Sequence, residues 1–251
     1  MERLNNSKKE NADISLKIEK IRNLLKIDYT EKEKNDFNKW KENLPENSLD
    51  NPIKVKNVNE IFNFLPSSPN WQKEDIKIAF QKEGGFTEKQ LKEIFYGFSL
   101  NSPEFEIGLS IISEDKIYII VGDKEGYNSG EGGENYGHYH PISLIEKIKE
   151  KNDLPEIFIS GLMPSRGDLV SWEKYFKKGQ RITRIFSKNG YLEVEAADNF
   201  KGFNIDNIAS FASKYFDLFL GKNELGIKTE KDMIEYFNDK FLLNIKTYYR
   251  Q

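Results

Sequence analysis

The chain has no cysteine among its 251 residues. It can therefore form no disulfide and no thiolate metal site, and it has no cysteine nucleophile. Any metal ion must be held by nitrogen and oxygen ligands. Histidine is also scarce, because the chain contains only two, His138 and His140.

Long apolar runs and an excess of one charge are missing as well. The longest apolar run, Ile117 to Val121, is far shorter than the roughly 20 residues that cross a bilayer as a helix. The N-terminal residues contain no apolar segment of a secretory signal, so we expect a cytoplasmic protein with no membrane partner. The 38 basic and 41 acidic residues are well mixed, which argues against a nucleic-acid partner.

The composition is that of a soluble globular protein, with 37% hydrophobic and 31% charged residues. The length suits one substantial domain with extensions or two small domains. Pro, Ser and Asn gather between Asn47 and Asn70 and mark a boundary. We expect an N-terminal extension over residues 1–70, a central domain over residues 71–222 and a C-terminal helix that packs on it over residues 223–251.

Two helices are predicted in the N-terminal extension. The apolar residues of the first helix lie at helical spacing: Ile14, Ile18, Ile21 and Leu25. The second helix centres on Phe37 and Trp40. We interpret both as a packing or partner-docking extension.

Helices and strands are both predicted from residue 71 onward. Thr87 and Gln90 form a capping box that predicts a helix through Phe98, and residues 107–122 predict a hairpin. Further patterns predict a short helix from Ser143, a strand from Glu156 to Ser160, a helix from Ser165, a hairpin with an Asn189-Gly190 turn that favours type I′ geometry, and helices over residues 204–220 and 229–245.

The two histidines stand in the sequence His138-Tyr139-His140-Pro141. Residues two apart in an extended chain point to the same side, so both imidazoles can converge on one point. Pro141 removes a backbone donor and so ends the strand. Such a pair is suited to zinc, whose catalytic sites hold three protein ligands and leave a fourth position for water. A third ligand is therefore required.

A candidate third ligand is Asp168, which follows Ser165 at the spacing of a capping box. Leu169, Val170 and Trp172 then continue as an apolar helical face. Both roles are compatible, because a carboxylate in the first turn of a helix is held rigidly and can still face a neighbouring strand end.

Together these motifs resemble the JAB/MPN (JAMM) metalloprotease family, in which a glutamate precedes H-x-H-P and S-x-x-D follows. The matching residues are Glu106, His138, His140, Pro141, Ser165 and Asp168. The likeness covers roughly residues 75–220, about three fifths of the chain. It implies an α+β fold that is cytidine-deaminase-like, with a three-layer arrangement in which helices flank a mixed β-sheet.

The resemblance also implies roles for these residues. His138, His140 and Asp168 would bind Zn²⁺, with a water at the open position. Glu106 would be the general base, and Ser165 would donate a hydrogen bond to the developing oxyanion. The reaction implied is hydrolysis of a peptide or isopeptide bond in a protein or peptide substrate, such as a ubiquitin-like conjugate.

The sequence departs from the family pattern in two respects. Residues 142–164 separate the histidines from Ser165, where the family has a short loop, and this insertion either shapes substrate choice or blocks the site. The identity of the base is also open, because Glu104 lies on the same strand face as Glu106 and Glu134 lies close to the histidines.

Two interpretations remain open from the sequence. The first is an active zinc peptidase or isopeptidase, which the presence of every ligand type favours. The second is a non-catalytic JAB-like module that serves binding and assembly, with the N-terminal helices as its docking arm. A zinc deaminase fits poorly, because that chemistry expects H-x-E and C-x-x-C, which the chain lacks.

Overall fold

The computed structural model describes residues 16–17, 20, 30–45, 52–66, 76–101, 104–122, 133–141, 155, 160–198 and 200–250. Their helices are α2 (Glu31–Glu42), α3 (Val58–Asn63), α4 (Glu88–Asn101), α7 (Arg166–Lys177), α8 (Ile205–Phe219) and α9 (Glu230–Phe241). Their strands are β1 (Ile53–Val55), β2 (Ile76–Gln81), β3 (Ile107–Ser113), β4 (Lys116–Val121), β5 (Glu134–Tyr139), β6 (Ile182–Ser187), β7 (Gly190–Ala196) and β8 (Leu243–Tyr249).

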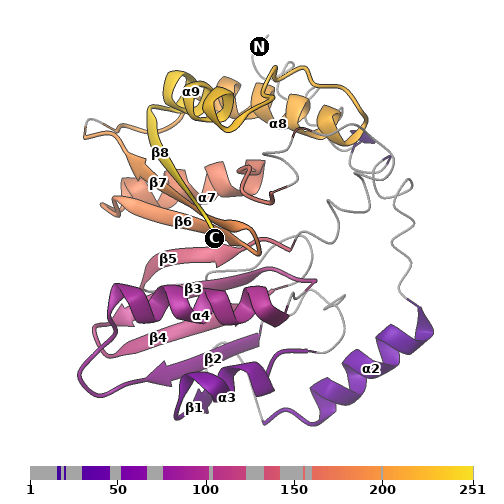
Figure 1. Cartoon of the computed structure of the whole chain (residues 1–251), viewed down its shortest axis with the longest axis vertical. Helices are drawn as coiled ribbons and strands as arrows, with labels where there is room; N and C mark the ends of the chain where they lie inside the picture. Colours follow the sequence, from indigo (N-terminus) through magenta and orange to yellow (C-terminus); the bar gives the residue numbers. More distant parts are fainter. Residues whose placement is uncertain are drawn as a thin grey trace, which may run out of the picture. The chain divides into compact units, whose positions relative to one another are not determined.

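The strands form an eight-stranded sheet in the order β1-β2-β4-β3-β5-β6-β7-β8 (Figure 1). The pairs β1–β2 and β5–β6 are parallel, whereas β2–β4, β3–β4 and β3–β5 are antiparallel. A mixed sheet combined with helices confirms the predicted α+β class. The finer expectation, a JAB/MPN fold, stays a prediction.

The chain divides into two compact units. One, the histidine unit, comprises Tyr29–Ile142, Thr183–Tyr191 and Tyr248–Gln251. The other, the α7 unit, comprises Met1–Asp28, Ser143–Ile182 and Leu192–Thr247. The three-part division expected from composition stays a prediction.

One face of the sheet in the histidine unit is apolar and packs against α4 (Figure 1). The helix begins as predicted, because Thr87 Oγ1 accepts from the Gln90 N–H at 3.3 Å and Gln90 Oε1 accepts from the Thr87 N–H at 3.0 Å. Four of its side chains are fully or almost fully buried: Leu91, Ile94, Phe95 and Phe98. Each such side chain contributes roughly 1.5–3 kcal/mol by leaving water, so packing holds α4 against the sheet.

The predicted hairpin over residues 107–122 is confirmed by β3 and β4, which pair antiparallel. Ser113 and Asp115 stabilise its turn, where the Ser113 hydroxyl donates to Asp115 Oδ1 at 2.7 Å. That hydrogen bond, with a second from the Gln81 side chain, lowers the pKa of the Asp115 carboxyl. The predicted helix around Phe37 is confirmed by α2, in which Phe37 is buried.

In the α7 unit, capping boxes begin two of the helices. Ser165 caps α7 and Thr229 caps α9, each paired with an aspartate three residues later, Asp168 and Asp232. The helix predicted from Ser165 and the helix start predicted at Thr229 are therefore confirmed. Helix α7 packs against α8, with Leu169 and Trp172 buried.

The predicted helix over residues 229–245 is wrong at its C-terminal end. Helix α9 stops at Phe241, because Leu242 adopts the left-handed conformation with φ 55° and ψ 44°. Strand β8 follows, with buried Leu243 and Ile245 alternating with exposed side chains. This alternation has the period of a strand, so the region 223–251 holds a helix and a strand where a helix alone was expected.

The predicted hairpin over residues 181–196 is confirmed in its strands, because β6 and β7 are neighbours in the sheet. Its turn is not type I′, which needs a positive φ at both central residues. Among the described residues other than glycine only Leu242 has a positive φ, so Asn189 does not meet that condition. Gly190 has φ 152°, and a Cβ there would collide with the Tyr248 carbonyl oxygen.

Three other expectations concern residues outside the described part of the chain. They are the first N-terminal helix with Ile14, Ile18, Ile21 and Leu25, the short helix from Ser143, and the strand over residues 156–159. Ser160, the last residue of that predicted strand, lies in a turn. None of the described helices is both long and apolar enough to cross a membrane.

Candidate metal centre

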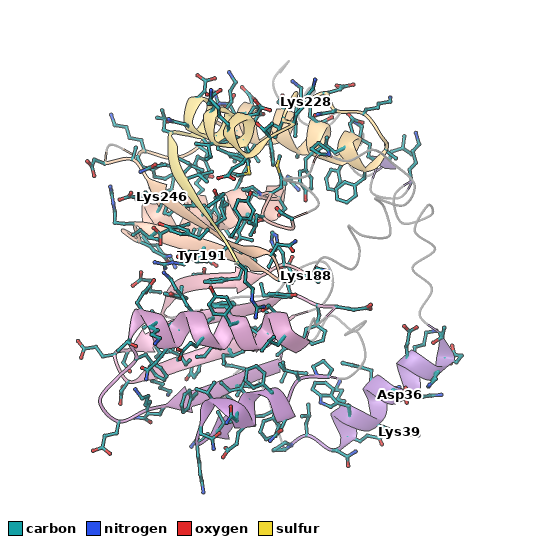
Figure 2. All side chains as sticks on the ribbon, in the orientation of Figure 1. Asp36, Lys39, Lys188, Tyr191, Lys228 and Lys246 are labelled. Atoms are coloured by element: carbon teal, nitrogen blue, oxygen red, sulfur yellow. The ribbon has the colours of Figure 1, made fainter. Side chains whose placement is uncertain are left out.

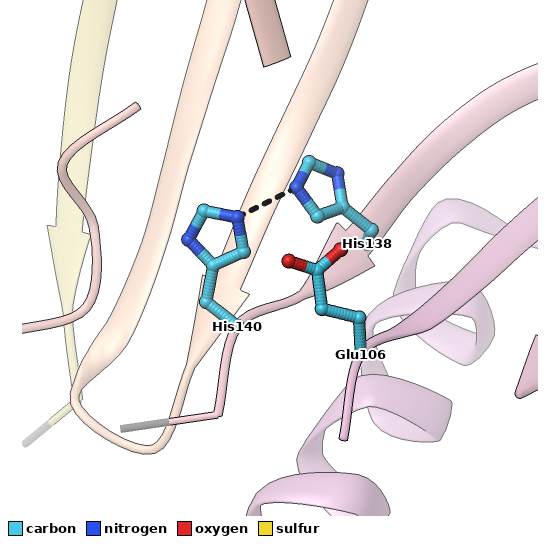
Figure 3. A group of neighbouring side chains, drawn as sticks. All are labelled: Glu106, His138 and His140. Atoms are coloured by element: carbon cyan, nitrogen blue, oxygen red, sulfur yellow. Dashed lines mark hydrogen bonds between the residues drawn. The ribbon is translucent and has the colours of Figure 1, made fainter. Parts of the chain in front are cut away.

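Glu106, His138 and His140 converge in the histidine unit (Figure 3). One potential ligand atom from each side chain lies within 4.8 Å of the others. The two imidazoles are buried, with 4% and 9% of their surface exposed, whereas Glu106 is half-buried. Two imidazoles and a carboxylate are a donor set that suits zinc.

The pairing of β3 with β5 explains this convergence. Gly108 lies opposite His138, and Ile107 lies opposite Tyr139, in an antiparallel register. Continuing that register by one residue places Glu106 opposite His140. Because side chains alternate along a strand, Glu106 and both histidines share one face of the sheet. Gly108, the residue opposite His138, has no side chain on this face.

A β-bulge at Tyr136 sets which residues of β5 share that face. Leu109 pairs with Gly137 and Ser110 pairs with Asn135, so Tyr136 is the extra residue on β5. The Tyr136 ring lies 6.3 Å from the ring of Phe95 on α4 and therefore belongs to the apolar face. Bulges redirect side chains beside functional sites, and this one keeps Asn135 and His138 on the opposite face.

Strand β6 fixes the other side of β5. His138 pairs with Ile185, and the backbone N–H of His140 donates to the Phe186 carbonyl at 2.8 Å. Gly137 allows this close approach, because a Cβ there would lie 2.7 Å from the Arg184 carbonyl oxygen. The backbone of both histidines is therefore held by strand pairing rather than by a mobile segment.

Glu106 is the carboxylate that the structure brings to the histidines. Its carbonyl accepts from the Gly122 N–H at 2.9 Å, which anchors it to the end of β4. Of the other two carboxylates considered, Glu104 is not in the group, and Glu134 is exposed and lies opposite Ile111 at the far end of β5. The geometry thus favours Glu106 over both.

The two imidazoles form a hydrogen bond to each other in Figure 3, with 2.8 Å between their Nε2 atoms. One Nε2 must donate and the other must accept. A tetrahedral zinc with Zn–N bonds near 2.0–2.1 Å requires the two nitrogens to be about 3.3 Å apart. Their separation is thus about half an ångström short of this value, which a small rotation of either ring supplies.

Ser165 and Asp168 belong to the α7 unit, where they bond to each other. The Asp168 N–H donates to Ser165 Oγ at 3.2 Å, and Asp168 Oδ2 accepts from the Ser165 N–H at 2.6 Å. Asp168 is buried, with 6% exposed. The structure confirms their capping role, while their roles as third ligand and oxyanion donor stay predictions.

The sequence did not reveal several residues that shape the centre. Strand pairing sets the effect of Gly108, Gly137 and the bulge at Tyr136. In the sequence, only the position of the glycines inside strand patterns indicated a close approach of the backbone.

On the apolar face, burial raises the pKa of the Tyr136 hydroxyl well above its ordinary value, although the nearby Arg184 charge opposes this.

Comparison of the chain with protein-family models, curated proteins and solved structures found no match. The motif residues and the geometry of the centre are therefore the features that point to a function.

Proposed function

We propose that the protein is a zinc-dependent metallopeptidase or isopeptidase that hydrolyses a peptide or isopeptide bond. The observation that supports this most directly is the convergence of Glu106, His138 and His140 on one face of the sheet. A carboxylate beside two imidazoles combines a metal-binding pair with a proton acceptor. That combination is what metal-assisted hydrolysis requires.

The two imidazoles would hold the metal through their Nε2 atoms, and the resemblance adds Asp168 as the third ligand. Bound zinc would supply a water of lowered pKa and a Lewis acid for the substrate carbonyl. His138 and His140 are buried and held by backbone pairing, so they are positioned before any metal arrives. Such preorganisation favours binding, because little side-chain entropy remains to be lost.

Glu106 would move the proton. Its carboxylate takes a proton from the attacking water and delivers it to the leaving amine, so one water is consumed and an acid and an amine are formed. Glu106 is only half-buried, so it is less enclosed than the two histidines. Ser165 would donate its hydroxyl proton in a hydrogen bond to the oxyanion.

The test combines metal analysis with a cleavage assay. The purified chain should contain about one zinc, and both metal and activity towards a panel of peptides and ubiquitin-like conjugates should disappear in His140→Ala. Asp168→Ala should have the same effect if this residue is the third ligand. Val170→Ala is the matched control, because Val170 lies on the same helix and is 49% exposed.

The alternative is a non-catalytic JAB-like binding and assembly module. A chain that purifies without zinc, does not take it up, and binds its protein partner equally well after His140→Ala would establish that alternative. Zinc binding without cleavage of any member of the panel would instead separate the metal site from the proposed reaction.

A further inference from the structure

A second cluster of charged and phenolic side chains lies on the apolar face of the histidine unit, opposite the metal centre. There, Glu88 Oε1 accepts from two cations. Arg184 Nη2 lies 2.9 Å away and Lys92 Nζ lies 3.3 Å away. The Arg184 side chain is only 10% exposed and that of Lys92 is 25% exposed. Two partly desolvated cations therefore meet at one carboxylate oxygen.

Two tyrosine hydroxyls complete the cluster. Lys92 Nζ donates to the Tyr191 hydroxyl at 3.0 Å, and the Arg184 guanidinium lies 4.5 Å from the centre of the Tyr136 ring. The Tyr136 hydroxyl is buried and makes no well-formed hydrogen bond among the described residues, although the Glu88 side chain lies near enough to raise the pKa of this hydroxyl. A buried phenol without a partner is costly, and such groups call for a physical explanation. The charges of Arg184 and Glu88 both act on this hydroxyl.

We propose that Arg184, Lys92, Tyr136 and Tyr191 form an anion site for a phosphate group, and that the Glu88 carboxylate is its replaceable internal occupant. The site is separate from the metal centre and goes beyond the proposed hydrolysis.

The number of hydrogen-bond donors in the cluster favours phosphate over a carboxylate as the ligand. Both cations bond the same oxygen of Glu88, and the Tyr136 hydroxyl, although near Glu88, makes no well-formed hydrogen bond in this arrangement. Phosphate carries up to four acceptor oxygens and a charge near −2, so it can engage two cations and two phenols together. Arginine in particular matches the geometry of phosphate oxygens.

The Glu88 carboxylate can leave the site while the donor side chains keep their positions. The Glu88 side chain is 51% exposed, so it can swing into water without opening the core. Arg184 is held in β6, one residue before the partner of His138, and the Tyr191 ring, labelled in Figure 2, stacks on Tyr248 at 4.5 Å. Burial lowers the pKa of Lys92, but its bonds to Tyr191 and Glu88 outweigh this and raise it, so the ammonium stays charged.

The competing explanation is a structural ion pair that ties α4 to β6. That role needs Glu88 and Arg184, and the Tyr136 hydroxyl adds little to it, because it makes no well-formed hydrogen bond to either residue. Tyr136→Phe therefore separates the two explanations. Removing a buried hydroxyl that has no partner should leave the thermal midpoint unchanged or raise it, whereas it should weaken a phosphate that uses this donor.

The experiment is calorimetric titration of the full chain with inorganic phosphate. Glu88→Gln should bind phosphate about tenfold more tightly than the wild type, because the internal competitor has lost its charge. Tyr136→Phe in the Glu88→Gln background should bind about tenfold more weakly than Glu88→Gln alone. Glu93→Gln is the matched control, since Glu93 lies on the same helix and pairs only weakly with Lys89 at 3.9 Å, and its phosphate affinity should equal that of the wild type.

Two further titrations complete the experiment. Phenyl phosphate, titrated in parallel, assigns the site to a phosphate monoester if it binds more tightly than inorganic phosphate, and to the free ion if it does not. Phosphate binding must persist in His140→Ala, which excludes the metal centre as its location. The proposal is overturned if Glu88→Gln binds phosphate no more tightly than about 10 mM, or if Tyr136→Phe leaves the affinity unchanged.

Discussion

Tyr136 and His138 lie two residues apart on β5, yet their side chains project from opposite faces of the sheet. In a regular strand they would share a face. The bulge at Tyr136 breaks that alternation, so that β5 places Tyr136 on the apolar face and His138 on the face of the metal centre. The tyrosine packs with the aromatic core beneath α4, and the histidine faces Glu106. The metal centre therefore depends on how β5 pairs with its neighbours as much as on its ligands.

Gly137→Ala tests this dependence directly. The added Cβ would lie 2.7 Å from the Arg184 carbonyl oxygen and 3.1 Å from the Phe186 ring, so β5 and β6 must separate. We expect a loss of about 1–3 kcal/mol in the free energy of unfolding, together with weaker zinc binding, measured by urea denaturation and zinc titration.

Gly167→Ala is the control for Gly137→Ala. Gly167 lies within α7, and a Cβ there would meet only Ser165 Oγ at 3.4 Å, an ordinary contact. Alanine favours a helix over glycine by about 0.5–1 kcal/mol, so this variant should be slightly more stable than the wild type. Equal stability of the two variants would contradict the close approach described at Gly137.

Ser165 offers a way to separate capping from chemistry. Ser165→Ala removes the N-cap of α7 and should cost about 1 kcal/mol of stability as well as activity. Ser165→Asp retains a side-chain acceptor for the Asp168 N–H but carries no proton to donate at neutral pH. We therefore expect Ser165→Asp to unfold at nearly the wild-type temperature while its cleavage rate falls about 100-fold or more.

A cleavage rate for Ser165→Asp close to that of the wild type would assign this serine to helix capping alone. Thermal unfolding and initial cleavage rates, measured on the same preparations, provide both quantities.

Local signals in the sequence predicted the elements that depend on residues close in the chain. The caps at Thr87, Ser165 and Thr229 each need a partner three residues later, so a short window contains the whole interaction. The shared face of His138 and His140 follows from strand periodicity in the same way.

Features that depend on distant pairing could not be predicted. No residue near Tyr136 in the sequence indicates that Leu109 and Ser110 of β3 pair with its two neighbours and leave Tyr136 without a partner residue in the ladder. A bulge cannot be recognised from its own strand, because it is defined by the pairing with the partner strand. Strand β8 was missed for a related reason. The helical pattern of α9 continues up to Leu242 in the sequence. The left-handed conformation of Leu242 that ends the helix is stabilised by the surrounding fold, whereas a glycine would have marked it in the sequence.

The Thr229–Asp232 cap predicts a pH dependence of stability. Hydrogen bonds from the Thr229 and Lys228 backbone lower the pKa of the Asp232 carboxyl. A group whose pKa is lower in the folded chain stabilises it fully above the unfolded pKa, near 4. This contribution is lost as the pH falls through the folded value. Asp232→Asn should therefore be less stable than the wild type at pH 6, and the difference should shrink below pH 4.

Thermal unfolding of both proteins between pH 6 and pH 2 checks this expectation. Thr229→Ala in the same series removes the hydroxyl but keeps the backbone donors, so its pH dependence should follow the wild type more closely. A stability difference between Asp232→Asn and the wild type that stays constant with pH would contradict the assignment.

Glu106 and Glu104 form the most informative pair of matched variants, because they lie two residues apart and only Glu106 joins the histidines. Glu106→Gln is nearly isosteric and removes the proton acceptor, so we expect zinc content to be retained and the cleavage rate to fall about 100- to 10,000-fold. Glu104→Gln removes the same charge from the same segment and should leave both quantities unchanged. Zinc analysis and single-turnover cleavage measure them. If Glu104→Gln lost turnover while Glu106→Gln kept it, the base would be the other carboxylate, and the convergence in Figure 3 would describe a metal ligand instead.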